Sequence, residues 1–228
     1  MLTTAHIADA CLRTGVPVRC APSGIQAVAP SGIQAVIPGS RVQGRALPVC
    51  HAGSVDVFLE AFESAAPGDI LVVGNGGRLD EACVGDLIAI EAQAAGLGGI
   101  VIWGLHRDSA DIAAIGLPVF SLGSLPAGPL TVRDRAAAVT VGSWPVTRDD
   151  IVVGDEDGVL FLPAASAEQI FATAETIRDT ERRQADLIRA GRTLRSQVKF
   201  DVYLARQAEH PSLTFREHLR NVGGEIEV

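Results

Sequence analysis

Three charged residues stand out in this chain because their types and spacing suit a small-molecule site. Asp86 is followed, after residues 87–106, by the adjacent pair Arg107 and Asp108. Carboxylate oxygens are ligands that suit Mg²⁺ or Mn²⁺, and an adjacent arginine offers a planar pair of donors to a carboxylate or an enolate oxygen. Together they predict a pocket for a small 2-oxo acid. The alternative is a surface turn capped by Asp108, with Asp86 an ordinary helix N-cap.

The surrounding segments predict a strand, helix and strand that would bring these residues together. Residues 69–73 are typical of a buried strand, Asp86 begins an alanine-rich helix that should end at Gly96, and residues 99–103 form a second buried strand. A right-handed crossover places both strand C-termini at one edge of the sheet, where open α/β folds bind ligands. The free amides at the start of the helix would add an anion pocket there.

The middle of the chain, from about residue 68 to residue 163, resembles the RraA-like family. This family includes the class II 4-hydroxy-4-methyl-2-oxoglutarate / 4-carboxy-4-hydroxy-2-oxoadipate aldolases and the regulator of ribonuclease E activity. Its aldolase members carry an Asp, twenty residues and then Arg-Asp, a spacing that this chain keeps. The other matching residues are Pro67-Gly68-Asp69, the glycine-rich turn at 74–77, residues 82–86, 96–99, Gly104, 117–120, and 155–159 ending at Pro163.

The resemblance implies a role for each residue of the predicted site. It places the metal-binding aspartate at Asp108 and the arginine that meets the pyruvyl group at Arg107. Asp86 takes the place of the aspartate that orients metal-bound water. The pyruvate carboxylate would be held at the start of the predicted helix, by Gly85 and by the amides of Asp86, Leu87 and Ile88.

Three further positions bear on the resemblance. Glu181 is the candidate for a family glutamate that reaches in from a neighbouring subunit. Trp103 stands where many members have an acidic residue, and His106 also departs from the family pattern. We therefore expect a more apolar pocket beside the metal and a different substrate, with His106 a candidate for assisting proton transfer.

Composition limits the other classes of function. The chain has 228 residues, 47% of them hydrophobic, which is enough for one sizeable α/β core. Its formal net charge of −8, without a basic stripe, argues against nucleic-acid binding. No apolar run approaches the roughly 18 residues that span a bilayer, and the first 15 residues do not have the pattern of a signal peptide. We therefore expect a cytoplasmic protein with neither nucleic-acid nor membrane partners.

The lysine and cysteine residues limit the reaction mechanisms that we expect. Lys199 is the only lysine, and it lies far in the sequence from the glycine-rich turns. Schiff-base aldolases need a lysine amine beside the substrate carbonyl, so carbonyl activation here should be by a metal, Mg²⁺ or Mn²⁺. Cys83 precedes Asp86 by three residues and could be a nucleophile, but a lone cysteine among alanine and valine is more often a small buried hydrophobe.

The rest of the chain predicts helices at 3–14, 54–64 and 166–192, a strand at 42–50 and several strands within 130–163. A tight hairpin turn is expected at residues 155–158 in preference to a calcium loop. The letters APSGIQAV at 21–28 repeat at 29–36, which indicates a tandem duplication in a surface loop. We predict an RraA-like α/β domain of the swivelling β/β/α type over residues 1–194. A helical C-terminal arm, residues 195–228, should lie at a subunit interface.

These observations and the resemblance favour a metal-dependent aldolase. It would cleave a 4-hydroxy-2-oxo diacid to pyruvate and a second oxo acid, with oxaloacetate decarboxylation as a related activity. A homotrimer or a dimer of trimers is expected. The alternative is a non-enzymatic protein-binding regulator that resembles the inhibitor of ribonuclease E. Asp86 favours the enzyme, because an inhibitor has no need of a carboxylate that orients water.

Overall fold

The computed structural model describes residues 1–21, 25–26, 29–30, 32–129 and 131–222. The chain forms two compact units. Unit 1 comprises Met1–Leu2, His6–Val16 and Gln169–Val228, and unit 2 comprises Thr3–Ala5 and Pro17–Glu168. The predicted boundary at residue 194, with an interfacial arm beyond it, stays a prediction.

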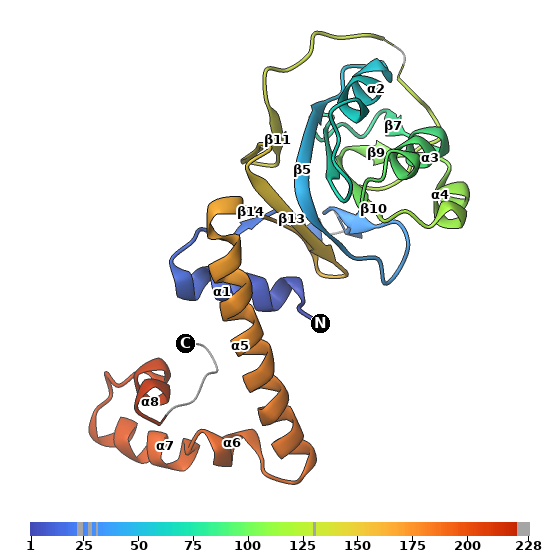
Figure 1. Cartoon of the computed structure of the whole chain (residues 1–228). Coiled ribbons are helices and arrows are strands. Elements are labelled where there is room, and N and C mark those ends of the chain that lie inside the picture. The colour runs from blue at the N-terminus through green and yellow to red at the C-terminus, as the bar shows by residue number, and fades with distance from the viewer. Residues whose placement is uncertain (22–24, 27–28, 31, 130, 223–228) are drawn as a thin grey trace. The chain divides into compact units, whose positions relative to one another are not determined.

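Unit 2 is built on a mixed eight-stranded sheet (Figure 1). Its central strands β5, β6, β8 and β10 are parallel, and the strands outside them are antiparallel. This arrangement confirms the predicted mixed α/β class. In spatial order the strands are β1 (Arg19–Cys20), β14 (Gly158–Pro163), β13 (Asp150–Asp155), β5 (Val42–Cys50), β6 (Ile70–Gly74), β8 (Gly99–Trp103), β10 (Val119–Ser121) and β4 (Gln34–Ala35).

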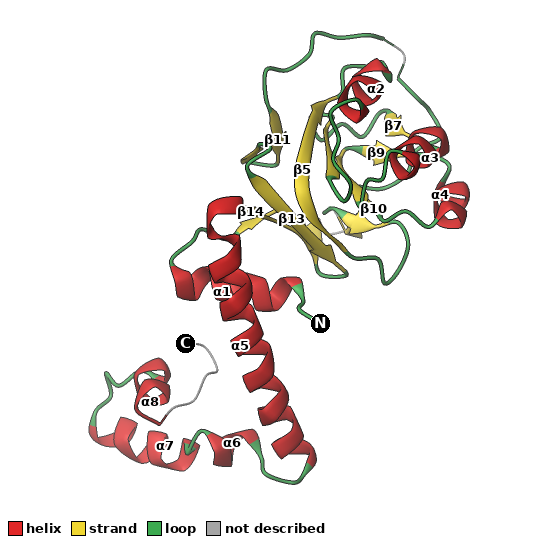
Figure 2. Cartoon of the chain, in the orientation of Figure 1, coloured by secondary structure: helices red, strands yellow, loops and turns green. Residues whose placement is uncertain are grey.

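Strands β6, β8 and β10 are buried on both faces, as their nearly continuous apolar sequences require. On one face, Leu71 of β6 and Ile102 of β8 pack in a cluster with residues of α2 (Asp56–Phe62), α3 (Asp86–Ala94) and α4 (Ser109–Ile115). Figure 2 shows these three helices beside the sheet. On the other face, Val72 and Val101 pack with residues of the hairpin formed by β11 (Val139–Val141) and β12 (Trp144–Val146).

The predicted strand, helix and strand around Asp86 are confirmed. Strand β6 pairs in parallel with β8, and α3 lies between them in the sequence. Helix α3 begins at Asp86 and is followed by Gly96, which has a φ of 80° that suits the residue after a helix. Helix α4 and two short strands in this region were not predicted. The short strand β7 (Ala82–Val84) pairs in parallel with β9 (Leu105–His106) and joins the two turns that carry the charged residues.

Most other predicted elements are present with shifted ends. Helix α1 spans Thr4–Thr14, α2 is shorter than predicted, and β5 has the predicted bounds. The hairpin turn is confirmed, because Asp155 pairs with Gly158 at the end of β13 and β14. The duplicated APSGIQAV segment lies partly outside the described residues; within it are β2 (Ile25–Gln26), β3 (Ala29–Pro30) and β4.

Unit 1 is helical. It contains most of α1 and α5 (Ala164–Arg189), followed by α6 (Leu194–Gln197), α7 (Phe200–Glu209) and α8 (Phe215–Val222). Helices α7 and α8 meet through rings, with Tyr203 and Phe215 centroids 5.0 Å apart. Lys199 is exposed at the start of α7. Among the described residues, none of the helices has both the length and the apolar character needed to span a bilayer.

Candidate functional site

The structure brings Asp86, Arg107 and Asp108 to neighbouring turns of unit 2. The backbone amide of Arg107 donates to the carbonyl of Val84 (2.9 Å), so the turn after β9 lies directly beside the turn before α3. A Cβ atom placed on Gly85 would lie 2.6 Å from Oδ2 of Asp108 and 3.1 Å from Nε of Arg107. A larger residue at position 85 would have to displace these side chains from their observed positions, and the expected proximity of the two turns is present. The roles of these residues stay predictions.

Asp108 adopts a backbone conformation that is unusual for a residue other than glycine. Its φ of 58° and ψ of 43° are left-handed, which costs about 1–2 kcal/mol for most L-residues but is tolerated by aspartate. It stands at the N-cap position of α4 but makes no side-chain capping hydrogen bond. Its Oδ2 instead lies 3.2 Å from Nε of Arg107. Asp108 therefore does not act as a side-chain cap of α4.

The N-terminus of α3 lacks a conventional cap. Gly85 occupies the N-cap position and has no side chain to accept the first-turn amides. The amide of Leu87 donates to Oδ1 of Asp86 (2.8 Å). A substrate carboxylate at this helix end would therefore compete with Asp86 for the Leu87 amide.

A cavity of about 210 Å³ has Asp86 and Arg107, but not Asp108, among its lining residues. That volume is smaller than the ~300–1,000 Å³ of typical drug-sized ligand sites, which suits a small acid. Arg107 and Asp86 supply its charged groups. Its other lining residues come from α2's start, β7, α3 and the loop before residue 130: Val55, Ala82, Cys83, Val84, Gly85, Leu87, Ile88 and Pro129.

Cys83 lines this cavity but does not have the properties of a nucleophile. Burial raises the pKa of its thiol to about 12, and the charge of Glu81 adds to the rise. Its Sγ lies 3.6 Å from the carbonyl of Leu105, to which it donates. The structure therefore supports the prediction of a small buried hydrophobe.

The two residues that depart from the family pattern have structural contacts. Both ring nitrogens of His106 lie 2.8 Å from hydroxyls, Nδ1 from Ser121 and Nε2 from Ser109. Burial lowers the pKa of His106, which favours a neutral ring. The indole of Trp103 packs on the glycine-rich turn, where a Cβ atom on Gly77 would lie 3.0 Å from the ring. Neither side chain is among the described residues that line the 210 Å³ cavity.

Glu181 lies on α5 in unit 1, and its placement relative to the cavity of unit 2 is not defined. Its Oε2 lies 3.0 Å from Nε2 of His6 on α1, and the carboxylate is half exposed. Its predicted role as a glutamate donated to a neighbouring subunit stays a prediction.

The donor set suits a hard divalent cation. The carboxylate of Asp108 remains 35% exposed, so oxygen atoms are available to an ion and to its water. Within the described part of the chain, no three His, Cys, Asp or Glu side chains come together as a ready-made metal site. Mg²⁺ commonly binds through one or two carboxylates and keeps several waters, so the residues present are compatible with it.

The sequence reasoning missed a buried polar cluster at the same end of the sheet. It consists of His51, Asn75, Glu81 and Arg133, of which the first three are almost fully buried. Arg133 donates to both carboxylate oxygens of Glu81 (2.8 and 2.5 Å). The spacing of these residues along the sequence does not indicate the cluster, because Arg133 lies on a loop 52 residues after Glu81.

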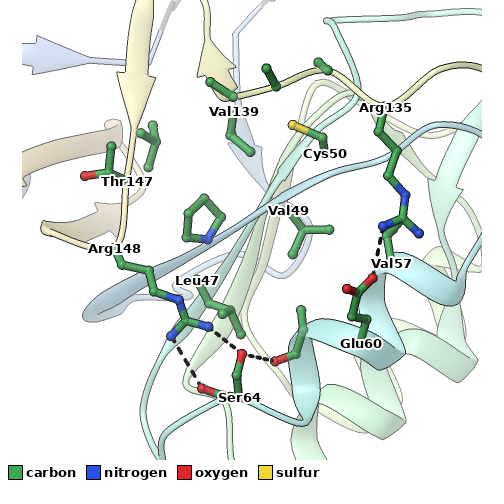
Figure 3. Close-up of a pocket in the computed structure, with 16 residues that line it drawn as sticks. Leu47, Val49, Cys50, Val57, Glu60, Ser64, Arg135, Val139, Thr147 and Arg148 are labelled. Carbon is green, nitrogen blue, oxygen red and sulfur yellow. Dashed lines mark hydrogen bonds and ion pairs between the residues drawn. The ribbon is translucent and has the colours of Figure 1, made fainter.

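A larger cavity in unit 2, of about 530 Å³, does not have Arg107 among its lining residues. Figure 3 shows this cavity. It has an apolar floor that includes Leu47, Val49 and Val139. Arg148 at its rim donates to the Ser64 hydroxyl (2.7 Å), and Arg135 donates to Glu60 (3.0 Å). Neither Asp86 nor Asp108 is among its lining residues, so its size does not make it the candidate site.

A comparison with known protein families decides the family. The model "RraA-like: Aldolase/RraA" matches residues 4–161, which include all three charged residues of the candidate site. The chain belongs to the RraA-like aldolase family. The family assignment agrees with the resemblance predicted from the sequence.

Similar proteins extend this assignment. A Dechloromonas aromatica protein named "Putative 4-hydroxy-4-methyl-2-oxoglutarate aldolase" is 40% identical over 103 residues, which cover 44% of this chain and 63% of that relative. The match therefore spans less than two thirds of the relative's length. A solved structure of an uncharacterized Pseudomonas syringae protein superposes with a TM-score of 0.71 and 25% identity, covering 85% of this chain and 90% of the other.

A second solved structure supports the fold alone. It is Streptomyces coelicolor RraAS2, described as an unusual member of the RNase ES inhibitor RraA protein family. It superposes with a TM-score of 0.65 at 24% identity, covering 81% of this chain and 90% of the other. The RraA-like fold predicted from the sequence is thereby confirmed.

Proposed function

We propose that this RraA-like protein is a divalent-metal-dependent aldolase. It would cleave a 4-hydroxy-2-oxo diacid to pyruvate and a second oxo acid, with oxaloacetate decarboxylation as a related activity. The observation that carries the proposal is the contact of the Arg107 and Asp108 side chains with Gly85, at the uncapped start of α3 and beside a small cavity. The aldolase name of the Dechloromonas relative supports it.

Asp108 would hold the metal, Mg²⁺ or Mn²⁺. When bound, the ion would act as a Lewis acid that stabilises negative charge on the pyruvyl group. The position of Arg107 Nε, 3.2 Å from Oδ2 of Asp108, would help to orient that carboxylate.

Arg107 and the start of α3 would bind the pyruvyl group. The Arg107 guanidinium lines the cavity and would donate to an oxygen of the substrate. The first-turn amides of Asp86, Leu87 and Ile88 would hold its carboxylate beside Gly85. The helix backbone fixes the direction of these amides, and the Leu87 amide would exchange its hydrogen bond to Asp86 for one to the substrate.

Asp86 would orient the water molecule that takes the proton from the substrate's 4-hydroxyl. Its carboxylate lines the same cavity as Arg107, and its position at the first residue of α3 is rigid. Proton removal there is required for the bond between C3 and C4 to break. Glu181 of a neighbouring subunit is proposed as a further carboxylate of the complete site.

Pyruvate release tests the proposal. The purified protein is assayed on a panel of 4-hydroxy-2-oxo diacids and on oxaloacetate, with and without a chelator. We expect activity that a chelator removes and that Mg²⁺ or Mn²⁺ restores. Inactivation by borohydride in the presence of substrate, with modification of Lys199, would instead show a Schiff-base mechanism. Absence of turnover across the panel would favour the protein-binding regulator.

A further inference from the structure

The loop after β10 crosses the edge of the sheet where the candidate site lies. We name residues 124–129 and 131–138 the strap. The strap starts beside β9, because the amide of Leu125 donates to the carbonyl of His106 (2.9 Å). Ala127 then accepts a hydrogen bond from the amide of Ala82 in β7 (2.8 Å). The first half of the strap is thus tied to the two strands that carry the site turns.

This part of the strap contacts Arg107. A Cβ atom placed on Gly128 would lie 3.3 Å from Nη1 of Arg107, so the strap backbone runs close to the guanidinium. Pro129 lines the same cavity as Arg107. The Arg107 side chain is 47% exposed, and the backbone at Gly128 is one of its neighbours.

The second half of the strap is fastened by Arg133. Its guanidinium makes the two hydrogen bonds to Glu81 and a third, from Nη2, to Oδ1 of Asn75 (3.1 Å). The Arg133 amide donates to the carbonyl of Ala52 (2.7 Å). A bidentate pair with a carboxylate that is only 5% exposed is a much firmer attachment than a surface ion pair.

The anchor that receives Arg133 is itself fixed. Oδ1 of Asn75 also lies 3.0 Å from Nδ1 of His51, and since this oxygen can only accept, Nδ1 must carry the proton. The His51 ring stacks on Phe58 of α2. Burial would raise the pKa of the Glu81 carboxyl, but the hydrogen bond and charge of Arg133 bring that pKa below its usual value. Glu81 therefore stays ionised as the partner of Arg133.

We propose that Arg133 is a positioning residue that fastens the strap and thereby holds Gly128 and Pro129 against Arg107. It contacts no reacting group and would act on substrate binding through Arg107. This inference rests on the proposed function for its kinetic consequence, but its structural consequence can be measured without any turnover.

The test uses Arg133→Lys, which keeps the charge and removes the planar pair of donors. Two matched variants serve as controls. Arg135→Lys lies on the same strap but pairs with the exposed Asp56 and Glu60, as Figure 3 shows for Glu60. Arg78→Lys lies beside the same Glu81 carboxylate (3.6 Å) but not on the strap.

Two measurements need no activity. Hydrogen exchange of strap peptides should accelerate roughly tenfold or more in Arg133→Lys, the scale of one lost hydrogen bond to a charged group. Exchange of β6 and β8 peptides should not change. Phenylglyoxal should modify Arg107 several-fold faster, as read by peptide mass. Both controls should match the wild type. Unchanged strap exchange, or unchanged Arg107 reactivity, in Arg133→Lys would overturn the proposal.

Kinetics supply the third measurement. If the wild type releases pyruvate, Arg133→Lys should lower kcat/KM roughly tenfold, because a loosened strap would leave Arg107 less well placed to bind the pyruvyl group. A loosened strap with an unchanged kcat/KM would overturn the positioning role. A wild type without turnover would refute the proposed function, and the exchange and modification results would still decide the role of Arg133.

Discussion

Gly85 affects the geometry of the candidate site because it has no side chain. Its φ of −128° and ψ of −169° are extended, so any residue could adopt this backbone. The demand for glycine comes instead from Asp108, whose Oδ2 occupies the space that a Cβ atom would need. Sequence reasoning placed Gly85 among the substrate-binding residues, but its contact with Asp108 depends on tertiary structure and could not be predicted.

We predict that Gly85→Ala displaces the Asp108 carboxylate. Because Oδ2 is the free end of a partly exposed side chain, the fold should lose only about 0.5–1.5 kcal/mol, the scale of an off-rotamer side chain, whereas the displaced carboxylate should remove most of the proposed activity. Thermal unfolding of a double-mutant cycle with Asp108→Ala measures the clash directly. The Gly85→Ala penalty should shrink in the Asp108→Ala background. An equal penalty in both backgrounds would contradict this account.

Separate substitutions should distinguish the three charged residues. Asp108→Ala should abolish metal binding and activity, and Arg107→Ala should lower the rate roughly 10²-fold, the scale of losing one preorganised donor. Asp86→Asn should retain binding of metal and of pyruvate, as measured by calorimetry, while turnover falls. Wild-type turnover in Asp86→Asn would exclude its proposed role in proton transfer.

The buried histidines predict how stability depends on pH. Burial lowers the pKa values of His51 and His106 in the folded protein, whereas in the unfolded chain they should titrate near 6.5. As pH falls through about 6.5, the unfolded state therefore takes up protons that the folded state does not. Each histidine should then lower the free energy of unfolding by up to about 1.4 kcal/mol per pH unit.

Denaturant unfolding between pH 7.5 and pH 5 measures this slope. His106→Gln should have a flatter slope than the wild type at the acidic end, even if it is less stable at pH 7.5. A slope identical to that of the wild type would show that His106 does not contribute.

At the scale of elements, the longer segments were predictable and the shorter ones were not. Strand β5 was predicted with its observed bounds and α3 with its observed start, because apolar periodicity and turn residues mark long elements clearly. Strand β7 has three residues, too few for a periodic signal. The pairing of β7 with β9 holds the two site turns together. The proximity of these turns therefore depends on a strand that is too short to predict from the sequence.

The candidate site likewise has features that could be predicted from the sequence and features that could not. The spacing of Asp86, Arg107 and Asp108 revealed the charged residues, because a βαβ crossover fixes where strand ends lie. The contacts of Trp103 and His106 could not be predicted, because each is decided by a partner elsewhere, Gly77 for the indole and Ser121 for the imidazole. The contacts of Arg133 could not be predicted either, because its partners Glu81 and Asn75 are distant in the sequence.

At the scale of the whole molecule, the helices after residue 194 carry the main prediction about assembly. Val202 and Leu204 are 42% and 50% exposed, although they are large apolar side chains. Such a surface is costly in water, which supports the proposal that the arm docks on a neighbouring subunit of a trimer.

Truncation after Leu194 tests this proposal. We expect light scattering to show loss of the oligomer, and pyruvate release to fall with it because the site would need a neighbouring subunit. Circular dichroism of the sheet-containing remainder controls for unfolding. An intact oligomer with full activity would reject the arm as an assembly element.

The single lysine offers a way to measure how the two units are arranged in solution. Lys199 is exposed in unit 1, and the α-amine of Met1 belongs to the same unit. Cys20 is an exposed thiol in unit 2. An amine-reactive donor dye and a thiol-reactive acceptor dye would therefore report from different units without any engineered residue. Energy transfer between them, followed during addition of Mg²⁺ and pyruvate, would serve as a molecular ruler for motion between the units.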